Sequence, residues 1–231
     1  METTANDTLS APCPPALPVP SSPNASLVRT VFTVAWMSVL LGVGLELLLI
    51  ALAAGAGTAS KLQPFIADLA QKISWASFVC IGLAFGKVAG GLRPQVTGLM
   101  GFLAAPAGFS VARATHKATE KALGLASGVP ALGPSPYLLA GIKALEYAVL
   151  GLILGWMLKK AWSGAWSFMA VGLGAGVIFG GTIIGLMDWH AAKALAPVAL
   201  ATRGINEILF PVGCALVLYA ADSLSKKVEI S

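Results

Sequence analysis

Two glutamates lie inside long apolar stretches of the sequence, where a carboxylate is costly. Glu46 falls near the middle of the apolar run from about Thr30 to Gly57, and Glu146 falls inside the run from Tyr137 to Leu158. A charge at such a depth costs about 3 kcal/mol on insertion scales, so these side chains normally face the inside of a helix bundle and mark ion paths or proton relays. Two carboxylates that meet there can hold a cation or share a proton. We therefore interpret Glu46 and Glu146 as a pair of ion-binding or proton-relay residues.

A structural ion pair or polar contact between helices is the alternative interpretation of these glutamates. It applies most strongly to Glu146, because Lys143 lies one helical turn earlier and is close enough for an internal ion pair. Glu120, Asn206 and Glu207 form a second candidate set, and Asn206 and Glu207, like Lys143, are candidates for ion binding or proton relay. Asn206 and Glu207 lie near the start of the last apolar run, expected over about Ile205–Ala221. A carboxylate at a helix start also complements the helix dipole, and we favour that capping role for Glu207.

Two Gly-Gly pairs, Gly90–Gly91 and Gly180–Gly181, close two similar apolar segments. They can break a helix within the membrane and offer backbone groups to an ion. They can also allow helices to cross closely, which needs small residues spaced four apart. We favour close packing, because the spacing is regular in both copies, at Gly82, Gly86 and Gly90 and at Gly172, Gly176 and Gly180.

The chain carries signs of an internal duplication. Ser, Phe, Gly, Leu, Gly, Gly and Gly recur at an offset of 90 between residues 77–91 and 167–181. Leu45-Glu46 matches Leu145-Glu146 at an offset of 100, and residues 111–120 face 198–207 at an offset of 87. With three spans in each half, the second half enters the membrane from the opposite side, as in many transporters. The sequence thus predicts two inverted three-helix repeats.

Composition places the chain in a lipid bilayer. Hydrophobic residues make up 57% of it and charged residues only 11%, with a mean hydropathy of +0.82, whereas soluble domains carry about 25% charged residues. We predict an all-α, polytopic membrane helix bundle of about six transmembrane helices, in the cell or inner membrane rather than an organelle. The other spans are expected at about Ser74–Gly91, Val96–Ala112 and Ala165–Met187. The predicted organisation is a disordered Pro-rich tail over 1–28, a first membrane repeat over 29–123, a Gly/Pro linker over 124–136, and a second membrane repeat with a short tail over 137–231.

The motifs that are missing narrow the class of function. The sequence has no nucleophile elbow, P-loop, zinc motif or dinucleotide loop, so we expect no enzyme, no cofactor and no metal site. His116 and His190 have no partners at ligand spacing, and we read them as interfacial polar residues. The net charge of +5 fits contact with anionic lipid rather than nucleic acid. Lys and Arg are balanced between the two sets of helix ends, so they predict no orientation.

We predict a membrane transporter or channel for a cation or protons, with its path between the two repeats. The alternative is a non-transporting structural subunit of a larger membrane complex. The protein partners expected are further copies of this chain or subunits of such a complex.

Gly-Gly in the second and fifth helices of paired three-helix repeats resembles the architecture of the trimeric intracellular cation channels. The local likeness is confined to Gly180-Gly-Thr-Ile-Ile184. Those channels have a seventh helix, beyond the six expected here, so we treat the likeness as an analogy of architecture and assign the chain to no family.

Overall fold

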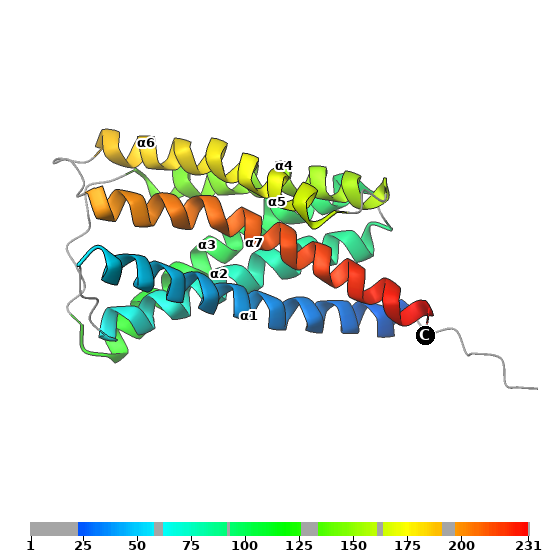
Figure 1. Cartoon of the computed structure of the whole chain (residues 1–231), viewed down its shortest axis with the longest axis horizontal. Helices are drawn as coiled ribbons and strands as arrows, with labels where there is room; N and C mark the ends of the chain where they lie inside the picture. Colours follow the sequence, from blue (N-terminus) through cyan, green and yellow to red (C-terminus); the bar gives the residue numbers. More distant parts are fainter. Residues whose placement is uncertain are drawn as a thin grey trace, which may run out of the picture.

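Six long helical spans lie side by side and alternate in direction along the bundle (Figure 1). The computed structural model describes residues 23–57, 62–91, 93–125, 134–160, 164–190 and 197–230, and every regular element within these ranges is a helix. Most of the expected tail, over 1–22, and the core of the expected linker, over 126–133, lie outside the described residues. The helices are α1 (Pro23–Gly55), α2 (Leu62–Ala89), α3 (Pro94–Ala122), α4 (Pro136–Lys159), α5 (Ala165–Ala175), the π-helical turn η1 (Gly176–Gly180), α6 (Gly181–His190) and α7 (Pro197–Ile230).

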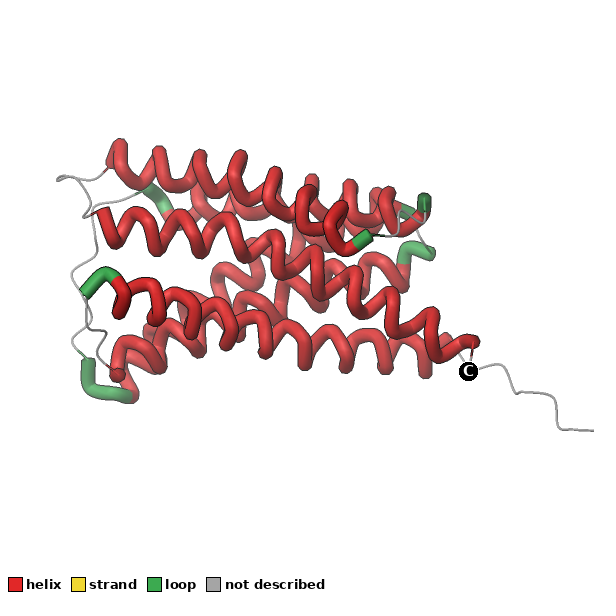
Figure 2. The backbone as a smooth tube through the Cα atoms, viewed as in Figure 1, coloured by secondary structure: helices red, strands yellow, loops and turns green. Residues whose placement is uncertain are grey.

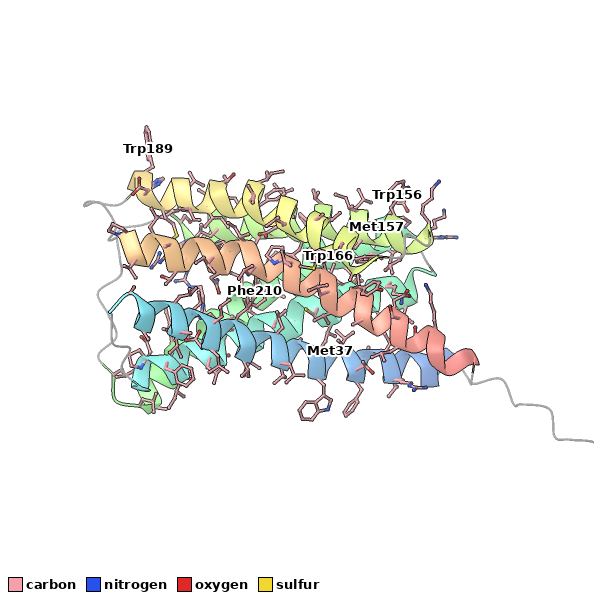
Figure 3. The ribbon with its side chains drawn as sticks, in the orientation of Figure 1. Met37, Trp156, Met157, Trp166, Trp189 and Phe210 are labelled. Carbon is pink, nitrogen blue, oxygen red and sulfur yellow. The ribbon has the colours of Figure 1, made fainter. Side chains whose placement is uncertain are left out.

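Each of the six spans is long and apolar enough to cross a bilayer, the fifth being formed by α5, η1 and α6 together. Figure 2 shows the described loops only at the two ends of the bundle. Large apolar side chains face outward along α1, among them Phe32, Trp36 and Leu40. Trp189 projects at one end, and Trp156 and Trp166 lie toward the other (Figure 3), as expected of aromatic anchors at two interfaces. The prediction of an all-α bundle with six helical spans long and apolar enough to cross a membrane is confirmed, whereas the internal repeat stays a prediction.

Several helices begin earlier than hydropathy indicated. Helix α2 starts at Leu62 rather than near Ser74, so Asp68 and Lys72 lie inside the helix. Helix α7 starts at Pro197, and Glu207 therefore lies about three turns into the helix. The capping role favoured for Glu207 is wrong for this reason. In α2 the missed turns carry Asp68, Gln71 and Lys72, which line a cavity and lower the hydropathy of the segment.

The glycines of the two similar segments allow close helix contacts. A Cβ on Gly172 would lie 2.6 Å from the Val212 Cα of α7, and one on Gly176 would lie 2.6 Å from the Ile208 carbonyl oxygen. Gly91 follows the end of α2 with a φ of +52°, which glycine adopts without strain. Gly180 and Gly181 do not interrupt the fifth span, because η1 passes directly into α6. Gly90 and Gly91 thus lie at a helix end, and Gly180 and Gly181 within a continuous span.

Candidate functional site

A polar cavity of about 500 Å³ lies between α1, α2 and α7, at the end of the bundle where α1 ends and α7 begins. Glu46 is nine residues from the end of α1 and Glu207 ten residues from the start of α7, which places both about 14–15 Å inside the helix ends. The polar and charged residues that line the cavity are Glu46, Asp68, Gln71, Lys72, Thr202, Arg203, Asn206 and Glu207.

Glu46 forms an ion pair with Lys72, which joins α1 to α2 within this cavity. Glu46 is buried and Lys72 is mostly buried. An acid and a base that are held together in low dielectric offset much of each other's desolvation cost. The pair is therefore locally neutral, and Glu46 carries no excess charge of its own.

Lys143 holds two carboxylates from different helices. Its Nζ donates to Glu146 Oε2 at 2.7 Å within α4, as the spacing of these residues predicted, and also forms an ion pair with Glu207 of α7. The exposed fractions of the three side chains are 8% for Lys143, 0% for Glu146 and 21% for Glu207. We call Lys143, Glu146 and Glu207 the buried triad. It links α4 to α7, both in the second half of the chain.

The buried triad has two carboxylates for one ammonium, so it carries one net negative charge when all three groups are ionised. The net charge stays at one negative charge when every charged residue that lines the 500 Å³ cavity is counted together with the buried triad. Among these groups the acids number four and the bases three, with histidine neutral: Glu46, Asp68, Glu146 and Glu207 against Lys72, Lys143 and Arg203. An uncompensated charge at this depth is costly, so the site favours the arrival of one positive charge.

His116 lies at the rim and ties α3 to α2. Its Nε2 is 3.1 Å from Asp68 Oδ1, and its Nδ1 is 3.5 Å from Glu120 Oε2. The interpretation of His116 as an interfacial polar residue stays a prediction, and the early start of α2 brings Asp68 opposite it. Within the described residues no group of three histidine, cysteine or acidic side chains is placed to hold a metal ion.

A layer of aromatic rings lies next to the charged residues of the two cavities. Trp75 packs edge-on against Phe109, Tyr147 and Phe210, with ring centroids 6.4, 5.6 and 6.2 Å away. Figure 3 places Phe210 inside the bundle. We call these four rings the aromatic floor. A smaller cavity of about 140 Å³ is lined by three of the rings, Trp75, Phe109 and Phe210, and shares Gln71, Lys72, Asn206 and Glu207 with the larger cavity.

Three buried polar atoms near the triad and the floor have no hydrogen-bond partner within the described part of the chain. They are Glu146 Oε1, Tyr147 Oη and Asn206 Oδ1. A buried polar atom without a partner costs about 1–3 kcal/mol. Such atoms normally meet water or a ligand, and Asn206 lines both cavities. The site is therefore built to receive a further donor.

On the other side of the floor, α2 and α7 are in direct contact. The Sγ atoms of Cys80 and Cys214 lie 3.3 Å apart, and both residues are buried. Further along, Lys87 forms an ion pair with Asp222, which also binds Lys226 at 2.7 Å. We call this contact the α2–α7 seam. The two helices thus diverge around the cavities at one end and meet at the other.

The structure separates the glutamates that the sequence suggested as a pair. Glu46 binds Lys72 and Glu146 binds Lys143, and no contact joins the two glutamates in the described chain. The carboxylate that shares the 500 Å³ cavity with Glu46 is Glu207. Sequence reasoning missed Lys72 and Asp68 as site residues. Their signal is the series Asp68, Lys72 and Trp75, which follows one face of a helix that was expected to begin later.

Comparison with known proteins gave no match: no family model, no curated protein and no solved structure is similar to this chain.

Proposed function

We propose that this protein is a membrane transporter for a cation or protons, with its path between the two halves of the chain. The observation that carries the proposal is the charged cavity, which is lined by Glu46 from the first half and Glu207 from the second. Together with the buried triad it holds one net negative charge. A site of this kind attracts one cation or proton and offers little to an anion.

A transporter fits these contacts better than an open channel. The cavity is accessible from one end, while the aromatic floor and the α2–α7 seam close the way to the other end. Movement of a cation through the protein then requires the seam to open as the cavity closes, which is alternating access. We propose that the halves are inverted three-helix repeats that move against each other. The opposite directions of α1 and α4 support this arrangement (Figure 1).

The charge count suggests how loading controls the movement. In the empty state one carboxylate of the site has no compensating cation, and closing the cavity would remove that charge from water at a cost of several kcal/mol. A bound cation or proton makes the site neutral and lowers this cost. Closure is then favoured only when the site is loaded, because a ligand shifts a conformational equilibrium through its different affinities for the two states.

The test is a flux measurement on the full chain reconstituted into lipid vesicles, with dyes that report protons, Na⁺ or K⁺. Glu46→Gln keeps the size of the side chain but removes its charge, so we expect flux to be abolished. Lys72 loses its partner, so the melting temperature should fall, and flux is measured at a temperature at which the variant still elutes as the folded protein. Asp188→Asn is the matched control, because Asp188 is exposed at the end of α6 and should leave flux unchanged. Wild-type vesicles that are no more permeable than empty ones would favour the structural-subunit alternative.

A further inference from the structure

The ammonium group of Lys143 shows what kind of cation this region accommodates. Its Nζ contacts the carboxylates of Glu146 and Glu207 and lies 6.0 Å from the ring centroids of Trp75 and Tyr147. Carboxylates neutralise the charge, and ring faces attract a cation through their quadrupole. Acidic oxygens on one side and aromatic rings on the other form an environment suited to an alkylammonium ion.

The adjacent 140 Å³ cavity has the same kinds of wall. Glu207, Asn206 and the rings of Trp75, Phe109 and Phe210 line it. Lys72 and Lys143 line it as well, and their charges are paired with the carboxylates of Glu46, Glu146 and Glu207. The buried Asn206 Oδ1 lacks a hydrogen-bond donor within the described chain. Glu207 already accepts from Lys143, but a carboxylate has about four acceptor positions and can serve a second ammonium. The wall therefore presents acceptors and apolar ring surface, beside two lysines whose charges are already paired with carboxylates.

We propose that the cation taken up is a small primary ammonium compound. Its ammonium donates to Glu207 and Asn206, and its hydrocarbon part lies against Trp75, Phe109 and Phe210. This inference rests on the proposed transport function and specifies its substrate. An alkali cation or a bare proton would bury no apolar surface on the three rings, whereas an alkyl group does. One monovalent ammonium also supplies the single positive charge that the site lacks.

The test measures calorimetric binding of methylammonium, ethylammonium and propylammonium to the purified full chain in detergent. We expect affinity to rise about fourfold for each added methylene, since each buries apolar surface on the rings. Phe210→Leu should flatten this series, and Phe102→Leu, on an exposed face of α3, should leave it unchanged. Glu207→Gln should weaken all three amines at least about tenfold, because a charge-assisted hydrogen bond is lost.

The wild-type series tests the proposal without any variant. Affinity that is independent of chain length, or Na⁺ and K⁺ binding as tightly as the amines, would overturn it. If reconstituted protein carries protons or Na⁺ but binds no amine, the proposed transport function is supported and the proposed ammonium site is refuted. If the affinity for amines rises with chain length as expected but no flux of any cation is found, the proposed ammonium site is supported and the proposed transport function is refuted.

Discussion

Removing Lys143 and removing Glu146 should have very different effects on stability, although both side chains are buried in the same ion pair. Lys143→Met leaves Glu146 and Glu207 without their shared cation, and Glu146 has no exposed surface. Loss of one partner from a buried pair costs about 3–5 kcal/mol, and here two carboxylates are affected. We therefore expect Lys143→Met to lower the free energy of unfolding by at least about 3 kcal/mol.

Glu146→Gln removes the carboxylate partner of Lys143 from the same ion pair. It leaves Lys143 and Glu207 as a one-to-one pair, so the buried triad becomes neutral. The glutamine keeps the volume and can still accept a hydrogen bond from Lys143, so we expect a change in the free energy of unfolding of no more than about 1 kcal/mol. The double variant should lose less stability than Lys143→Met alone, because the most buried carboxylate is gone.

Unfolding in mixed micelles, titrated with SDS and followed by circular dichroism, measures these differences. Lys159→Met is the matched control, since Lys159 is exposed at the end of the same helix and its loss should change stability by no more than about 0.5 kcal/mol. If Glu146→Gln destabilises the protein as much as Lys143→Met, then Glu146 is a required partner and the triad holds no excess negative charge. That result would refute the charge count.

Two further predictions concern packing and movement. Gly172→Ala places a Cβ against the backbone of α7 and should cost about 1–3 kcal/mol of stability. Gly174→Ala places its Cβ in open space and should be neutral or slightly stabilising in the same unfolding assay. Equal effects of the two variants would contradict the close contact of α5 with α7. Oxidation with copper phenanthroline in a Cys13→Ser background should link Cys80 to Cys214, whose Sγ atoms are 3.3 Å apart, and stop flux until a reductant is added; full flux through linked protein would mean that the α2–α7 seam does not open.

The sequence predicts the broad fold because apolar length is a strong signal, and the six spans come directly from it. It places helix starts poorly where a helix turns polar side chains toward a cavity, as at Asp68 and Lys72 in α2. A hydropathy window averages around the helix, so it cannot distinguish a polar face that lines a cavity from a polar link outside the membrane.

The site is only partly predictable for a related reason. Lys143 and Glu146 are close in sequence, and their ion pair follows from helical spacing alone. The contacts of Lys143 with Glu207 and of Glu46 with Lys72 join different helices, and they depend on how those helices pack. Similarity between the halves suggested that Glu46 and Glu146 would meet, but Glu46 forms an ion pair with Lys72 and Glu146 forms one with Lys143. Charge pairing therefore decides which acids line the cavity.

Uptake of cations or protons by vesicles that contain Glu207→Gln protein tests directly whether the excess negative charge draws a cation into the site. The substitution leaves Lys143 paired with Glu146 and removes the excess negative charge next to the cavity. Protein that matches the wild type in elution and melting temperature should then show no uptake above that of empty vesicles. Uptake at the wild-type rate from the same protein would contradict the account, because the charge count leaves the neutral site no means of attracting a cation.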